Sequence, residues 1–146
     1  MRYTTVVEIN CPIDQVVEFF DSQENYPHWM EGLVRHTVVS GTFGQPGTKS
    51  ELEFQLGKRG FKMTEQVLER NFPAEYLVRY QTPGVENLVK SKFQSTPEGK
   101  TKYLSENEFQ FKGFMKIIAW LMPGSFKKQS LKYQTDFKQF VERNTP

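Results

Sequence analysis

Between residues 33 and 111, apolar and polar side chains alternate with a period of two in most of six successive segments. Such alternation is typical of β-strands that bury one face. The short connections GQPG, GKRG, NFPA, PGVE and PEGK contain residues that favour tight turns, and they leave no room for a crossover helix. The pattern therefore predicts an antiparallel meander with strands at 33–41, 50–56, 61–69, 75–82, 87–95 and 101–111.

Helices are predicted only before and after this meander. Residues 3–9 have the β-branched content of a further strand, and Pro12 is placed to open a helix as its first residue. The chain length of 146 residues suits one domain, residues 1–146, with a single core. We expect an α+β fold in which an antiparallel sheet of seven strands packs against a long C-terminal helix. The predicted helices, two of them short, span 13–22, 24–32 and 123–142.

The inward faces predicted by the alternation combine aromatic rings with hydroxyl and amide groups. The facing of 61–69 stays open, because Met63 and Val67 share a parity with Glu65 and Glu69. Buried polar groups need partners, so this interior is either a polar-networked core or the lining of a pocket. The residues on these faces are Phe54, Tyr76, Tyr80, Ser91, Asn107 and Phe109 on the strands, and Phe126, Ser130, Tyr133 and Phe137 on the last helix.

Composition narrows the functional classes. Cys11 is the single cysteine, so an intrachain disulfide is excluded, and no His, Cys or carboxylate spacing suits a metal ion. A net charge of +2 gives no electrostatic reason to expect nucleic acid. The first residues carry no apolar signal segment, and the apolar run 117–122 is too short to cross a bilayer. We expect a cytoplasmic protein with no metal, no cofactor and no nucleic-acid partner.

Several stretches together resemble the START-like superfamily, also called SRPBCC, which includes the polyketide cyclase/dehydrase proteins. They are the opening VVEINCPIDQVVEFFDSQENYPHWMEGL, the segment GQPGTKSELEF and the ending DFKQFVE. The resemblance follows the order of elements through essentially the whole chain. It implies the helix-grip fold, in which a curved seven-stranded antiparallel sheet wraps around the long C-terminal helix and leaves an internal cavity between them. It implies no shared catalytic motif, because members range from cyclases and hydrolases to carriers of lipids and hormones.

Two functions remain open on these residues. A cyclase or dehydratase needs a general acid or base in the cavity, and the clearly inward set contains none. His36 shares a parity with Val34 and Val38 and can face inward, whereas Glu65 and Arg79 can do so only in another register. The catalytic residues therefore stay unknown, and a cyclase or dehydratase is the alternative function.

Binding or carriage of a hydrophobic small molecule requires less. Aromatic walls with a few polar groups suit a lipid, an isoprenoid or an aromatic polyketide-like ligand. We take the ten inward residues given above as the ligand-binding set. The segment 114–122 places apolar residues between lysines. This pattern is compatible with a helical segment that packs against the sheet, with transient membrane contact, or with homodimerisation through the same residues.

Overall fold

All predicted strands are present in the computed structural model, which describes residues 1–145. The strands are β1 (Arg2–Ile9), β2 (Leu33–Ser40), β3 (Lys49–Leu56), β4 (Arg59–Asn71), β5 (Glu75–Thr82), β6 (Val85–Ser95) and β7 (Thr101–Phe111). The helices are α1 (Ile13–Phe20), α2 (Tyr26–Trp29) after a 3-10 turn (Gln23–Asn25), α3 (Phe114–Leu121) and α4 (Pro123–Arg143).

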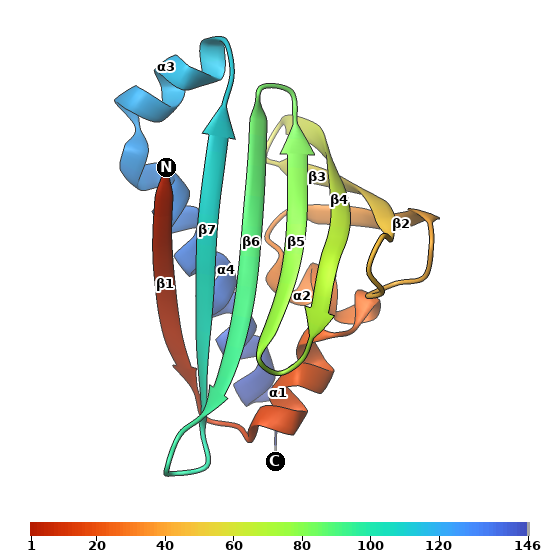
Figure 1. Cartoon of the computed structure of the whole chain (residues 1–146), viewed down its shortest axis with the longest axis vertical. Coiled ribbons are helices and arrows are strands. Elements are labelled where there is room, and N and C mark those ends of the chain that lie inside the picture. Colours follow the sequence, from red (N-terminus) through yellow and green to blue (C-terminus); the bar gives the residue numbers. More distant parts are fainter. Residues whose placement is uncertain (146) are drawn as a thin grey trace.

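The strands form one seven-stranded sheet in the order β1-β7-β6-β5-β4-β3-β2, and all neighbouring pairs are antiparallel. The strands β2 to β7 follow one another as a meander, and β1 adds to its far edge beside β7 (Figure 1). The predicted antiparallel meander is confirmed.

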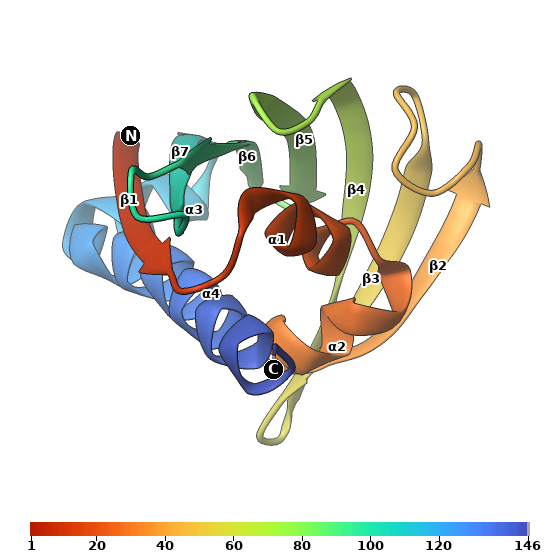
Figure 2. The same ribbon diagram turned by 90° about the horizontal axis from the view of Figure 1, so that it is seen from below.

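The sheet curves, and α4 lies on its concave side (Figure 2). α4 contacts β1 and α2 most extensively, while α1 packs against β6. The helix therefore runs nearest to the β1 edge of the sheet. This α+β arrangement is the predicted helix-grip fold.

A bulge in β4 explains why its facing is ambiguous in the sequence. The register against β5 shifts between Val67 and Glu69, so one extra residue enters the strand there. Before the bulge, Met63, Glu65 and Val67 face α4; Glu65 and Val67 are buried and Met63 is half-buried. A buried carboxyl group thus lies between the apolar side chains on the inward side of β4.

Phe20 on α1 is the centre of the packed core. Six other rings surround it at centroid distances between 5.1 and 6.0 Å, most of them edge to face. Such offset and edge-to-face contacts add to the stabilisation from burial alone. The surrounding rings are Trp29, Phe72, Tyr76, Phe93, Tyr103 and Phe137.

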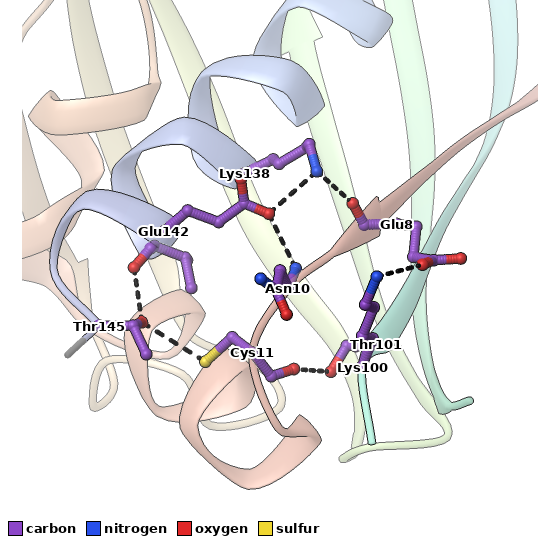
Figure 3. A network of polar contacts seen from close by, with 9 residues as sticks. Glu8, Asn10, Cys11, Lys100, Thr101, Lys138, Glu142 and Thr145 are labelled. Carbon is purple, nitrogen blue, oxygen red and sulfur yellow. Dashed lines mark hydrogen bonds and ion pairs between the residues drawn. The ribbon is translucent and has the colours of Figure 1, made fainter. Parts of the chain in front are cut away.

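Polar contacts hold the C-terminal end of α4 against the end of β1 (Figure 3). The backbone N–H of Asn10 donates to Glu142 Oε2 at 2.8 Å, and Lys138 Nζ donates to the same oxygen at 2.9 Å. Lys138 also donates to the carbonyl oxygen of Glu8 at 2.6 Å. Partial burial opposes ionisation of Glu142, but these hydrogen bonds outweigh it and lower the pKa of the carboxyl group.

Candidate functional site

Inward-facing rings are less tightly enclosed in the half of the interior that lies toward α3. Tyr80 on β5, Phe109 on β7 and Tyr133 on α4 are only half-buried. On the hairpin between β3 and β4, Leu56 is 40% exposed and Phe61 is 36% exposed. Apolar side chains on the concave face therefore reach solvent at this end.

The predicted ligand-binding residues divide between the two halves. Tyr76 and Phe137 belong to the core around Phe20, and Ser91 lies opposite Tyr76 in the register of β5 and β6. The other members are not among the rings around Phe20; Phe109 packs against Phe126, which follows α3 in the chain, and the rest are Phe54, Tyr80, Asn107, Ser130 and Tyr133.

Tyr3 joins this set, although the sequence analysis omitted it. Its ring stacks on Phe109 with centroids 5.9 Å apart. Its hydroxyl group donates to the carbonyl oxygen of Phe126 at 2.9 Å and lies 2.6 Å from Ser130 Oγ. Ser130, expected to orient a ligand, thus already has a protein partner. The alternation along the first strand, which places Tyr3 on the inward side, could have identified this residue from the sequence.

Asn107 is likewise engaged by protein groups. Its Oδ1 accepts from Asn87 Nδ2 at 3.3 Å, and its Nδ2 donates to Ser105 Oγ at 2.9 Å. Asn87 is also buried, and it was not among the predicted residues. The period of β6 places Asn87 on the same face as Ser91, so its inward position was readable from the sequence.

His36 and Glu65 form a buried pair between β2 and β4. His36 Nε2 lies 3.0 Å from Glu65 Oε1, and each side chain is 3% exposed. Gln23 Nε2 lies 3.1 Å from the carbonyl oxygen of His36 and 2.9 Å from its Nδ1. Because an amide N–H can only donate, this network assigns the ring proton of His36 to Nε2, which donates to Glu65.

Alternation allowed His36 to face inward, left the facing of Glu65 open and predicted that Arg79 faces outward unless the register differs. The structure places the first two inside and Arg79 on the outer face, where its Nε donates to Glu86 at 3.2 Å. The interior therefore does contain a titratable pair. Its partners lie far apart in the sequence and on strands separated by β3, so no local spacing could reveal it.

The phenol groups around the pair stay protonated to high pH. Burial is the largest cause that raises the pKa of Tyr80, and the charge of Glu65 is the next. The same two causes, in the same order, raise the pKa of Tyr26 and Tyr76. These hydroxyl groups are therefore hydrogen-bond donors at neutral pH.

A hollow of about 630 Å³ lies on the outer face of the sheet. Its lining includes Leu77, Leu88 and Lys90, whose side chains point away from α4. Most of its lining therefore lies outside the space between α4 and the sheet, although Tyr3 and Asn107 also line it. Within residues 1–145, no three His, Cys, Asp or Glu side chains are grouped so that they could hold a metal ion.

α3 lies at this end of the molecule (Figure 1), and four of its apolar side chains are exposed. Phe114 is 71% exposed, Ile117 53%, Trp120 79% and Leu121 62%. The opposite side of the helix, with Ala119, is buried. In the described part of the chain, no helix is long and apolar enough to span a membrane.

Solved structures with this arrangement share little sequence with the chain. The Zhui aromatase/cyclase from Streptomyces sp. R1128 is 11% identical, with a TM-score of 0.82 over 98% of this chain and 94% of that one. A conserved protein from Geobacillus kaustophilus is 13% identical, with a TM-score of 0.80 over 98% and 96%. Ara h 8.0201 is 14% identical, with a TM-score of 0.78 over 99% of both chains. At these identities the similarity shows the fold.

No curated protein matches the chain at a significant level. The family model described as "Polyketide cyclase / dehydrase and lipid transport" matches residues 1–135, which is most of the chain. This match agrees with the resemblance to the START-like proteins. The chain therefore belongs to the polyketide cyclase/dehydrase and lipid transport family, a START-like (SRPBCC) family with the helix-grip fold.

Proposed function

We propose that the protein binds and carries a hydrophobic small molecule between α4 and the half of the sheet that lies toward α3. The observation that carries this proposal is the incomplete enclosure of inward-facing apolar side chains there, with Leu56 40% and Phe61 36% exposed. A protein selected only for stability would close such a surface, as this chain does around Phe20. The family description, which includes lipid transport, supports the same function.

Apolar area sets the affinity in this proposal. Enclosing about 300 Å² of ligand surface contributes on the order of 7 kcal/mol before the entropic cost of association, which suits micromolar binding. A single hydrogen bond adds only about 1 kcal/mol. The rings of Phe109 and Tyr133 therefore govern affinity, and polar groups govern selection.

Native mass spectrometry of the protein purified from its own host tests the proposal. We expect a co-purifying hydrophobic compound that is recovered unchanged. Phe109→Ala should release it, whereas Phe109→Leu, which keeps apolar volume, should retain more of it. A protein that carries nothing and binds no apolar probe in titration contradicts the carrier function.

A cyclase or dehydratase is the second candidate, and the His36–Glu65 pair is the observation that favours it. A buried carboxyl group beside an imidazole supplies a general base of the kind that such a reaction needs. The test compares turnover and affinity in His36→Ala and in the parent protein. Turnover that disappears at unchanged affinity supports the enzyme and contradicts the carrier.

We further propose that α3 contacts an anionic membrane surface when the ligand is exchanged. Four apolar side chains of α3 are more than half exposed, and a tryptophan among them suits the membrane interface. No Asp or Glu occurs between Glu108 and Asp136, so the charged side chains there are all basic. They are Lys112, Lys116, Lys127, Lys128 and Lys132.

Vesicle binding tests this contact. We expect the protein to sediment with phosphatidylglycerol vesicles and much less with phosphatidylcholine vesicles, with a blue shift of Trp120 fluorescence. Trp120→Ala should reduce sedimentation, whereas Val39→Ala should not, although Val39 is 69% exposed. Light scattering that shows a dimer broken by Trp120→Ala, without vesicle binding, supports homodimerisation instead.

A further inference from the structure

Six buried side-chain polar atoms have no hydrogen-bond partner among the described residues, and two of them are acceptor oxygens on β4 and β6. These two oxygens are Glu65 Oε2 and Asn87 Oδ1. Glu65 is 3% exposed and Asn87 is 7% exposed. Buried polar atoms in folded proteins are nearly always paired, and an unpaired one destabilises the folded state. Two such oxygens in one region therefore require an explanation.

Both oxygens belong to one row of the sheet. Glu65 on β4 lies opposite Tyr80 on β5, and Tyr80 lies opposite Asn87 on β6. The row continues to Phe109 on β7. Because neighbouring strands are about 4.8 Å apart, the strands that carry the two acceptors are about 10 Å apart. Tyr80 lies between them.

The protein donors nearby cannot satisfy both oxygens. The Nε2 proton of His36 goes to the other oxygen of Glu65, and Asn87 Nδ2 donates to Asn107. The hydroxyl group of Tyr80 is buried beside the carboxyl group of Glu65 and can donate to it, but it has only one proton. At least one acceptor on this row therefore lacks a donor from Tyr80.

The buried charge of the described interior is also only negative. Among the buried residues of the described chain, Glu65 is the only charged residue, and none is Lys or Arg. A carboxylate or phosphate group near this row would meet a carboxyl group and no compensating cation, which is unfavourable in a low-dielectric interior. A hydroxyl or amine group would instead find acceptors.

We propose that the ligand of this site donates hydrogen bonds to Glu65 and Asn87 and carries no anionic group. This inference rests on the proposed carrier function and narrows its ligand class. A molecule with hydroxyl groups at two ends fits, with its apolar body between Phe109 and Tyr133. A free fatty acid, whose polar end is a carboxylate, does not fit. Tyr80 moves aside or becomes the third partner of the ligand.

Three probes of one shape test the proposal by titration calorimetry. They are 2,6-dihydroxynaphthalene, its dimethyl ether and 6-methoxy-2-naphthoic acid. We expect the diol to bind about tenfold more tightly than the ether, because the ether cannot donate. The acid should bind most weakly.

Glu65→Gln replaces the unpaired oxygen with an amide that donates, and it keeps the shape. We expect it to weaken binding of the diol about tenfold and to strengthen binding of the acid, with little effect on the ether. Glu69→Gln is the matched control, since Glu69 is exposed on the same strand. Asn87→Ala tests the second acceptor and keeps the proposal testable if Glu65→Gln does not fold.

The outcomes distinguish the hydrogen-bonding requirement of the ligand from the carrier function itself. Equal binding of all three probes, unchanged in Glu65→Gln and Asn87→Ala, overturns this inference and leaves the carrier function intact. Tighter binding of the acid than of the diol overturns it as well. Failure of the parent protein to bind any of the probes overturns both proposals.

Discussion

The two halves of the space between α4 and the sheet are built from similar residues but packed differently. Around Phe20, seven aromatic rings enclose one another and leave little apolar surface in contact with solvent. Around Tyr80 and Phe109, inward-facing rings are half-buried and two acceptor oxygens lack donors. The first half stabilises the fold, and the second half gives up stability where a ligand can supply the missing contacts.

The largest expected effect is on the packed half. Phe20→Ala should lower the free energy of unfolding by about 4 kcal/mol, because it leaves a cavity within a ring cluster that cannot collapse. Phe109→Ala should lower it by about half as much, since the ring of Phe109 is only half-buried. Chemical denaturation of both variants measures the difference. Equal losses would remove the distinction between the two halves.

High pH should act on both halves through their tyrosines. Burial is the leading cause that raises the pKa of all six tyrosines, and it brings Tyr103 to about 12. A raised pKa in the folded state gives stability that is complete below pH 10 and is lost as the pH rises through the folded value. For Tyr103 the shift corresponds to about 3 kcal/mol.

Absorbance at 295 nm, followed with circular dichroism, checks this expectation. The phenols should ionise together with unfolding, well above pH 10. A protein that stays folded while some of its tyrosines ionise near pH 10 would show that the half toward α3 is wetter than its burial indicates. Early ionisation of Tyr103 would contradict the closed core.

A smaller effect is expected where α4 ends. Glu142→Gln should lower the free energy of unfolding by about 1 kcal/mol, because it weakens the hydrogen bonds from Asn10 and Lys138. The pKa of Glu142 is lowered in the folded state. Its contribution is therefore present above the unfolded pKa and is lost as the pH falls through the folded one.

Thermal melts between pH 3 and pH 7 measure this contribution. The difference between Glu142→Gln and the parent protein should shrink toward acid pH. A difference that grows toward acid pH would mean that another group is responsible. Lys128→Gln serves as a control, since Lys128 is exposed on the same helix.

The smallest effect on stability is expected at α3. Trp120→Ala should change the free energy of unfolding by no more than about 0.5 kcal/mol, because the side chain is 79% exposed. Denaturation curves without vesicles measure it. A loss above 2 kcal/mol would place Trp120 in the packing of the folded protein and weaken the proposed membrane contact.

Much of the fold could be predicted from the sequence. The strands Glu75–Thr82 and Thr101–Phe111 have the predicted limits, and the sheet order follows from the short turns between successive strands. These features depend on side-chain period and turn residues, which are local in the chain. The strand Arg59–Asn71 was predicted to be shorter, and the sequence left open which of its side chains face inward. Its bulge and the buried Glu65 break the period of two.

The candidate site was predicted only in part. Phe109 and Tyr133 lie where alternation and helical spacing placed them, and Asn107 faces inward as expected. The pairing of His36 with Glu65 through Gln23 was not predicted. Residues from a 3-10 turn, β2 and β4 meet there only after the sheet has curved around the helices.

The sequence by itself determined the order of the elements and the faces of most strands, since period and turn chemistry act over a few residues. Only the tertiary structure decided which half of the interior closes around Phe20 and which acceptors remain unpaired. The physical reason is that packing and hydrogen-bond satisfaction depend on the distances between elements. Those distances are set by the curvature of the whole sheet and by the position of α4 near its β1 edge.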